Sequence, residues 1–125
     1  MTLYFFSAFA EAMQVANYGI GGHFTPHLDV LHETRHDPLH NRRIATWLGY
    51  LSNVKAGGGT AFLELNIVAE PHEGSAIFWY NLKENGDLEE RVKHAACPII
   101  EGNKWISNKW FHEFGQEFKR PCPAE

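Results

Sequence analysis

Two motifs that could bind a metal lie side by side in the stretch HFTPHLDVLHETRH, which covers residues 23–36. The first is the H-x-D of His27 and Asp29, and the second is the H-E-x-x-H that runs from His32 to His36. Residues i and i+2 of a β-strand point to the same face, so the first pair could supply two ligands from one strand. Residues i and i+4 share a helix face, so the second pair could bind the zinc of a peptidase, with Glu33 as general base.

The context of the H-E-x-x-H motif argues against a zinc peptidase. Pro38 follows His36 by two residues, and the residue before a proline is driven away from helical conformation. We therefore interpret His32 and His36 as loop histidines and favour the H-x-D motif. Two histidines and one carboxylate that leave further positions open form the site of non-haem Fe(II) oxygenases. The third ligand would have to come from another strand.

The chain around the H-x-D motif is expected to consist mainly of strands. Ile44, Thr46, Leu48 and Tyr50 alternate with the residues between them, which is typical of a strand with two different faces. We expect strands over residues 23–30, 43–52, 61–68, 75–82, 94–100 and 104–114, and a helix within residues 1–16, where apolar residues recur at helical spacing. This pattern favours an all-β sandwich, barrel or jelly roll built as one domain of 125 residues.

Composition excludes several classes of function. The formal net charge of −4 argues against a nucleic-acid surface, which needs a basic patch. No run approaches the roughly 18 apolar residues of a membrane span, and the opening residues lack the positive start of a signal peptide. The two cysteines, Cys97 and Cys122, are compatible with one disulfide or with two unrelated thiols.

Several longer segments resemble the collagen-type prolyl 4-hydroxylases. They are YGIGGHFTPHLD, NRRIATWLGYLSNV, AGGGTAF, GSAIFWYNL and RVKHAACPIIEGNKWISNKWFHEFGQEFKRPC, and with the residues between them they cover about residues 14–122. The resemblance implies the double-stranded β-helix, or jelly-roll, core of a 2-oxoglutarate oxygenase over residues 9–115, with an unplaced segment over 1–8 and a tail over 116–125. The first strands and helices of the family's domain have no counterpart here, so we expect an N-terminal part that is incomplete.

The resemblance also implies which residues form the site. His27, Asp29 and His94 match the iron ligands, and Lys104 matches the lysine that pairs with the distal carboxylate of 2-oxoglutarate. Residues matched to the surroundings of the cosubstrate are His112, Tyr18, Tyr50 and Thr46, and those matched to the substrate side are Trp110 and Arg43. For Tyr18, Tyr50 and Thr46, plain packing in the core is an equally good interpretation. Cys97 and Cys122 match a disulfide of the collagen enzymes, which implies the oxidising lumen of the endoplasmic reticulum.

The implied activity is hydroxylation of peptidyl proline coupled to decarboxylation of 2-oxoglutarate to succinate and CO2, with Fe(II), 2-oxoglutarate, O2 and ascorbate as cofactors. The implied partners are a proline-rich, collagen-like substrate and protein disulfide isomerase as a β subunit. Two alternatives stay open: a truncated copy that keeps the site without turnover, and a β domain that holds zinc or another metal at the same triad. The histidine-rich loop over residues 31–42 borders the site, so substrate choice could differ from that of the family.

Overall fold

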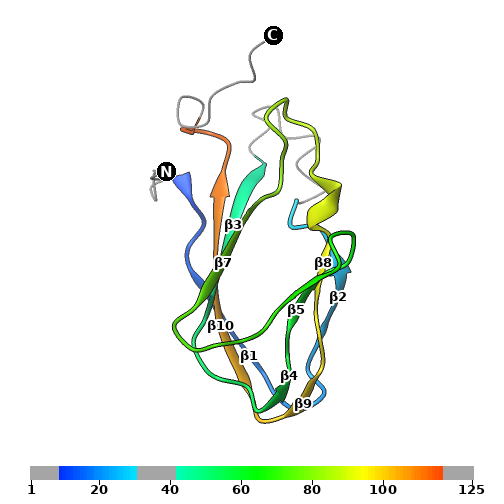
Figure 1. Cartoon of the computed structure of the whole chain (residues 1–125). Coiled ribbons are helices and arrows are strands. Elements are labelled where there is room, and N and C mark those ends of the chain that lie inside the picture. The colour runs from blue at the N-terminus through cyan, green and yellow to red at the C-terminus, as the bar shows by residue number, and fades with distance from the viewer. Residues whose placement is uncertain (1–8, 31–41, 117–125) are drawn as a thin grey trace.

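In the computed structural model, which describes residues 9–30 and 42–116, the chain forms two four-stranded antiparallel sheets (Figure 1). The first sheet has the order β1-β10-β3-β7 and the second has the order β2-β8-β5-β6. The strands of the first sheet are β1 (Gln14–Tyr18), β10 (Lys104–His112), β3 (Arg43–Tyr50) and β7 (Ala76–Tyr80). Those of the second are β2 (Phe24–His27), β8 (His94–Ala96), β5 (Thr60–Phe62) and β6 (Ile67–Ala69). The expected mainly β, jelly-roll fold is confirmed.

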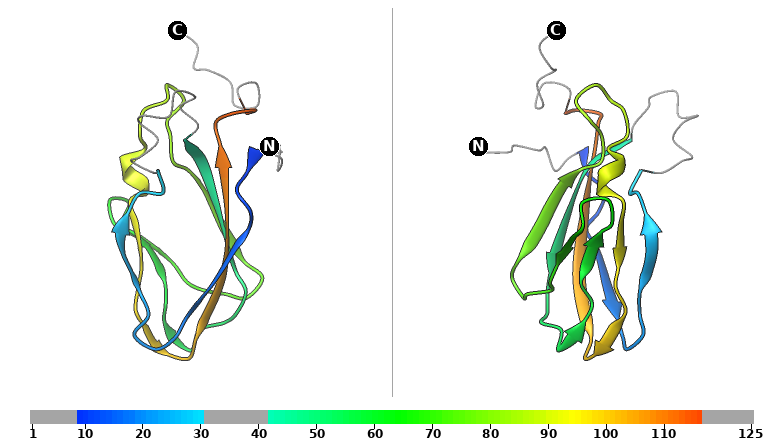
Figure 2. Two further views of the ribbon diagram at one scale, coloured as in Figure 1. Left: turned by 180° about the vertical axis from the view of Figure 1, so that it is seen from behind. Right: turned by 45° about the vertical axis from the view of Figure 1, so that its right-hand side comes forward.

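The two sheets face each other and enclose the core. They approach at the end where the short strands β4 (Ala56–Gly57) and β9 (Ile99–Glu101) pair, and they diverge toward the opposite end (Figure 2). One of the two faces expected for β3 points into the core, because Leu48 and Tyr50 belong to the buried cluster. The other buried members of this cluster are Phe62, Trp79, Val92 and Ile106.

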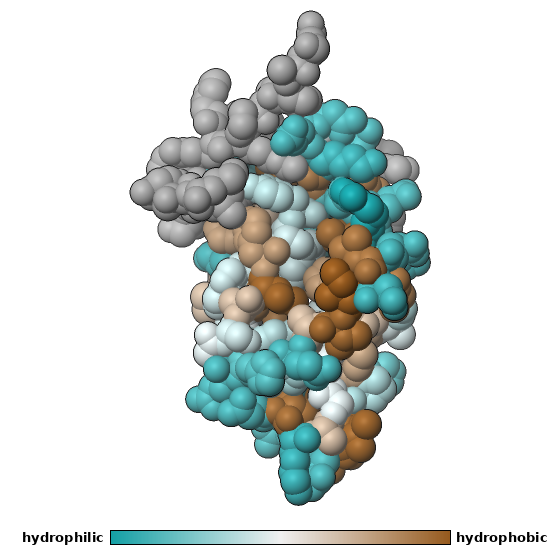
Figure 3. All heavy atoms as spheres, viewed as in Figure 1, coloured by the Kyte–Doolittle hydropathy of each residue, from teal (hydrophilic) through white to brown (hydrophobic). Residues whose placement is uncertain are grey.

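The outer edge of the second sheet is less well covered. The β5–β6 hairpin carries Leu63, Leu65, Ile67 and Val68 with about half of each side chain exposed. Figure 3 shows that apolar residues reach the surface in the middle of one face and again near its lower end, where they lie beside hydrophilic residues. Among residues 9–30 and 42–116, no helix has the length and apolar character needed to cross a bilayer.

Two expected strands differ from the structure, and one element was not expected. The single strand expected over residues 61–68 is wrong, because a turn that ends at Asn66, with φ 53°, folds it into β5 and β6. The strand expected over residues 94–100 is divided between β8 and β9, with Pro98, which has no N–H to donate to a ladder, between them. A 3-10 helix, η3 (Glu90–Val92), precedes β8.

The expected N-terminal helix is wrong in its second half. Residues 14–16 belong to β1, which pairs with β10, and Ala10 forms an isolated bridge with Phe111. Tertiary pairing with a long neighbouring strand overrides the helical spacing of the apolar residues. Residues 1–8 lie outside the described part of the chain.

Two glycines with the same backbone conformation allow a test of the packing between β4 and β9. Gly57 and Gly74 both have left-handed φ values, of 79° and 80°. A Cβ at Gly57 would lie 2.3 Å from the carbonyl oxygen of Pro98, whereas a Cβ at Gly74 would meet nothing within 4 Å. We expect Gly74→Ala to cost about 1–2 kcal/mol, the price of the backbone conformation alone. Gly57→Ala should cost clearly more in urea unfolding, and equal losses would contradict the packing described here.

Candidate active site

His27, Asp29 and His94 come together where the second sheet faces the first. His27 ends β2, His94 begins β8, and the antiparallel register of these strands places the two histidines opposite each other. One potential ligand atom from each of the three residues lies within 4.8 Å of the others. Oδ1 of Asp29 is 3.4 Å from Nε2 of His27 and 3.8 Å from Nε2 of His94. The predicted triad is therefore assembled in space.

Backbone carbonyls orient both imidazoles. Nδ1 of His27 is 2.7 Å from the oxygen of Thr25, and Nδ1 of His94 is 2.9 Å from the oxygen of Val92. A carbonyl can only accept, so each Nδ1 carries a proton, and each Nε2 faces Oδ1 of Asp29. Burial lowers the pKa of His94, which favours the neutral form that a metal ligand needs.

Asp29 is buried, with 7% of its surface exposed, and it is held as a carboxylate. Its Oδ2 accepts hydrogen bonds from Oγ1 of Thr46 at 2.6 Å and from Nε1 of Trp110 at 3.2 Å. Burial alone would raise the pKa of Asp29, but hydrogen bonding with His27, the charge of His94 and these two donors hold it below its usual value. Burial alone would lower the pKa of His27, but its hydrogen bonds with Asp29 and Thr25 raise it, so a metal ion would have to displace a proton shared with Asp29. Two imidazoles and one carboxylate are a donor set that suits non-haem Fe(II).

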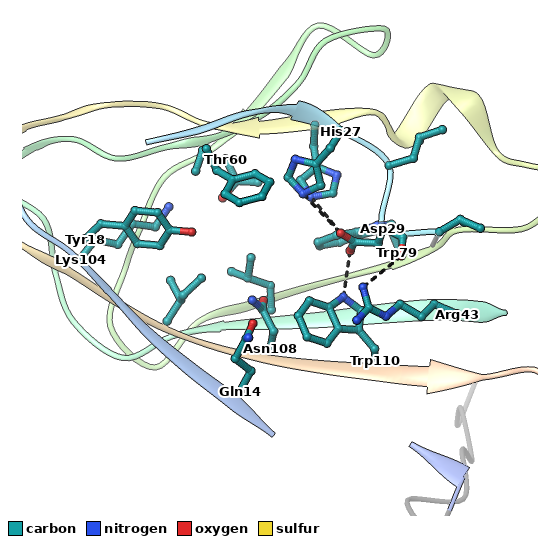
Figure 4. Close-up of a pocket in the computed structure, with 17 residues that line it drawn as sticks. Gln14, Tyr18, His27, Asp29, Arg43, Thr60, Trp79, Lys104, Asn108 and Trp110 are labelled. Atoms are coloured by element: carbon teal, nitrogen blue, oxygen red, sulfur yellow. Dashed lines mark hydrogen bonds and ion pairs between the residues drawn. The ribbon is translucent and has the colours of Figure 1, made fainter. Parts of the chain in front are cut away.

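The triad faces a cavity of about 500 Å³ between the sheets. Figure 4 shows His27 and Asp29 toward one end of this cavity and Lys104 with Tyr18 toward the other. Apolar side chains from the strands line the wall between them, among them Leu48 and Ile106. The cavity therefore has a candidate metal site at one end and a cation at the other.

Lys104 is a buried cation with 1% of its surface exposed. Its Nζ donates to the carbonyl oxygen of Gly58 at 2.5 Å and lies 5.8 Å and 5.4 Å from the ring centroids of Tyr18 and Tyr50. Among the described residues, no carboxylate lies within 4.0 Å of Nζ. Burial lowers the pKa of Lys104 from 10.5 to about 8. A buried ammonium in a cavity wall without a counter-ion is suited to a carboxylate ligand.

The remaining predicted residues divide into two groups. Tyr18, Arg43 and Trp110 line the cavity, whereas Tyr50, Thr46 and His112 are not among its lining residues. Tyr50 is buried and donates through its hydroxyl to Oγ1 of Thr60 at 2.8 Å, so the packing interpretation describes it better.

His112 and Arg43 meet at Glu11, a residue that no sequence motif singled out. The guanidinium of Arg43 donates to both carboxylate oxygens of Glu11, at 2.6 and 2.9 Å, and Nε2 of His112 lies 2.9 Å from Oε1. The same guanidinium lies 3.9 Å from the ring centroid of Trp110. Glu11 thus fixes Arg43 over Trp110. Its only signal in the sequence is a charge within an apolar stretch.

Two expectations fall wholly or partly outside the described residues. Cys97 is half-buried just after β8, but Cys122 lies outside the described residues, so their disulfide stays a prediction. The H-E-x-x-H of His32 to His36 also lies outside them, as does most of the histidine-rich loop.

Replacing Lys104 by methionine should stabilise the protein at neutral pH. A lysine pKa of about 8 instead of 10.5 means that the buried charge destabilises the folded state by roughly 3 kcal/mol. Methionine removes this cost but also loses the hydrogen bond to Gly58, which is worth about 1 kcal/mol. We therefore expect Lys104→Met to raise the free energy of unfolding at pH 7 by about 2 kcal/mol, measured in urea.

The sign of the pH dependence provides the control. Between pH 8 and 10.5 the unfolded chain binds the proton more tightly than the folded chain, so the wild type gains stability as pH rises. The advantage of Lys104→Met should therefore shrink at pH 9.5. A variant less stable than the wild type at pH 7 would contradict the view of Lys104 as an unpaired buried charge.

Comparison with known proteins bears on these features. Residues 13–112 match the family model described as the 2OG-Fe(II) oxygenase superfamily. The chain is 51% identical over 117 residues to prolyl 4-hydroxylase subunit alpha-1 of Homo sapiens, covering 90% of this chain and 22% of that protein. It is 48% identical over 121 residues to human subunit alpha-3, with coverages of 93% and 22%. The chain thus spans about a fifth of the length of these curated relatives.

Solved structures give a consistent result. The viral collagen prolyl hydroxylase of Paramecium Bursaria Chlorella virus-1, solved as a 2OG complex, matches with a TM-score of 0.75 and 30% identity over 82% of this chain and 59% of that chain. A prolyl-4-hydroxylase of Pseudomonas putida, with a TM-score of 0.60 and 23% identity over 82% and 51% of the two chains, supports the fold alone. The resemblance noted in the sequence is confirmed.

Proposed function

The chain belongs to the 2OG-Fe(II) oxygenase superfamily, and from this premise we propose that it hydroxylates peptidyl proline while 2-oxoglutarate is decarboxylated to succinate and CO2. The observation that carries the proposal is the cavity with the triad at one end and the buried, unpaired Lys104 at the other. The proline substrate is taken from the relatives, which are named as prolyl 4-hydroxylases.

His27, Asp29 and His94 would hold Fe(II) through Nε2, Oδ1 and Nε2. When bound, the metal supplies the redox chemistry with O2 that a protein side chain cannot perform. The residues of this chain orient and neutralise it: two carbonyls fix the imidazoles, and the ionised Asp29 contributes the negative charge. Ascorbate would serve to keep the metal reduced.

Lys104 would pair with the distal carboxylate of 2-oxoglutarate. Its ammonium is fixed by Gly58 and the two tyrosine rings before the ligand arrives, so little conformational freedom is lost on binding. The apolar wall formed by Leu48 and Ile106 is a surrounding of low polarity, which strengthens a charge pair beside it. Tyr18 would line this subsite directly, and Tyr50 would support it through Thr60.

Trp110 and Arg43 would lie on the substrate side. Both line the same cavity as the triad, and Figure 4 shows them beside Asp29 and away from Lys104. A flat indole and a guanidinium suit a proline ring and peptide carbonyls. We propose a collagen-like chain as substrate. His112 would contribute indirectly, because it contacts Glu11, the residue that holds Arg43. The relatives are named as alpha subunits, which supports a second kind of subunit as partner. We propose protein disulfide isomerase for that subunit and the endoplasmic reticulum lumen as location, as the resemblance in the sequence implies.

Succinate release tests the proposal. The protein is incubated with Fe(II), ascorbate, 2-oxoglutarate and a Pro-Pro-Gly repeat peptide, alongside His94→Ala and His23→Ala. We expect peptide-dependent succinate from the wild type and at least a hundredfold less from His94→Ala, because one ligand of the metal is gone. His23 is exposed, and within the described part of the chain its Nδ1 forms a hydrogen bond only with the local carbonyl of Gly21, so His23→Ala should keep the activity.

The alternatives predict other results. A truncated copy without turnover, or a β domain that holds zinc at the triad, would bind metal through His94 and release no peptide-dependent succinate. Release by the wild type that survives in His94→Ala would overturn the assignment of the triad.

Binding of 2-oxoglutarate should weaken as pH rises through about 8. Below this pH Lys104 of the free protein is an ammonium and attracts the carboxylate, and above it the group becomes neutral. We expect the dissociation constant of 2-oxoglutarate to rise several-fold between pH 7 and 9. It is measured without oxygen, in the presence of Fe(II), from the metal-to-ligand absorption band. Lys104→Arg stays charged over this range, so any residual binding by that variant should be flat. A dissociation constant of the wild type that does not change with pH would show that the distal carboxylate of 2-oxoglutarate does not pair with Lys104.

A further inference from the structure

A chain of hydrogen bonds reaches Asp29 from the first sheet. Nε1 of Trp79 donates to Oδ1 of Asn81 at 2.9 Å, and Nδ2 of Asn81 donates to Oγ1 of Thr46 at 2.9 Å. Thr46 in turn donates to Oδ2 of Asp29 at 2.6 Å. Asn81 and Thr46 are each 1% exposed, so water does not compete for these bonds.

The direction of every bond in this chain is fixed by the chemistry of its ends. The indole of Trp79 can only donate, so the oxygen of the Asn81 amide must face it and the amide nitrogen must face Thr46. The hydroxyl of Thr46 then accepts from Asn81, and its single hydrogen is left for Asp29. Together with Nε1 of Trp110, two donors occupy Oδ2, so this oxygen cannot carry a proton.

The two carboxylate oxygens of Asp29 are thereby made different. Oδ2 is committed to Thr46 and Trp110, while Oδ1 faces Nε2 of both histidines. Asp29 follows β2 of the second sheet, whereas Thr46 lies in β3 and Asn81 follows β7 of the first sheet. The chain of bonds therefore ties the one acidic ligand to the opposite sheet and sets which oxygen it presents.

We infer that Thr46 and Asn81 are positioning residues of the metal centre, which hold Asp29 as a ligand through Oδ1 alone and keep a further metal position open for the cosubstrate. This inference rests on the proposed function for the identity of the metal. It gives Thr46 a role different from the cosubstrate contact expected from the sequence, since Thr46 is not among the lining residues of the cavity. A network that only stabilised the core would leave metal binding unchanged.

Metal affinity measured apart from turnover tests the inference. Calorimetric titration of the full chain with Co(II), without cosubstrate, gives a dissociation constant for the wild type, Thr46→Val and Thr46→Ser. Valine keeps the shape of threonine and removes the donor, whereas serine keeps the donor. We expect Thr46→Val to weaken Co(II) binding tenfold to a hundredfold, in the range found for groups that orient metal ligands, and Thr46→Ser to restore it to within about threefold.

Two controls separate positioning from general stability. Ser107→Ala removes another buried side-chain hydroxyl, from a residue of β10 that pairs with Gly49 and does not line the cavity, and its Co(II) affinity should equal that of the wild type. Asn81→Asp places a second acceptor before Thr46 and turns its hydroxyl away from Asp29, so it should match the loss in Thr46→Val. If Asn81→Asp does not fold, the comparison of Co(II) affinity between Thr46→Val and Thr46→Ser tests the inference without it.

The outcomes distinguish this inference from the proposed function. A loss below tenfold in folded Thr46→Val, or an equal loss in Thr46→Ser, overturns the positioning role even if the wild type releases succinate. The other outcome is that the Co(II) dissociation constants of the variants and the wild type differ as expected, but the wild type releases no peptide-dependent succinate. This result supports the positioning role and overturns the proposed function.

Discussion

The structure of the site depends on one buried negative charge. Removing the carboxylate of Asp29 from water costs several kcal/mol unless its oxygens are paired, and the fold pairs them from both sheets. The second sheet contributes His27 and His94, and the first contributes Thr46 and Trp110. The position of Asp29 is therefore a consequence of how the two sheets face each other. The register of β2 with β8 places the two histidines opposite each other, and the register of β3 with β10 places Thr46 opposite Trp110.

A second buried charge lies at the far end of the cavity, and among the described residues it has no carboxylate within 4.0 Å. Lys104 has a carbonyl oxygen and two aromatic rings near its ammonium, and its pKa is lowered by burial to about 8. A fold selected for stability alone would place an apolar residue here. The contrast between an anion with several polar partners and a cation without a counter-ion gives the cavity its polarity, and this polarity suits a dicarboxylate with a metal-chelating end better than an apolar ligand.

The sequence predicted the parts of the site that short-range patterns can encode. The i and i+2 spacing of His27 and Asp29 and the alternation along β3 follow from strand geometry, and both were seen in the structure. His94 and Lys104 were assigned through resemblance, because nothing in the local sequence shows that β8 pairs with β2 or that β10 begins at the closed end of the cavity. Asn81 and Glu11 were missed, since their importance lies in contacts with residues 35 and 32 positions away. The same long-range pairing turned an apolar helical pattern near residue 14 into β1.

The two proposed substrate contacts, Trp110 and Arg43, also bind Asp29, the proposed acidic ligand of the metal. Trp110 lines the cavity and donates to Oδ2 of Asp29, while Arg43 lies over the same indole and donates to the main-chain oxygen of Asp29. Glu11 holds Arg43 through two charge-assisted hydrogen bonds, which limits how far the guanidinium can move. A peptide that displaced either side chain would therefore change the hydrogen bonding of the carboxylate. Thr46, which lies behind Asp29 and outside the cavity lining, is the donor that such a displacement would leave in place.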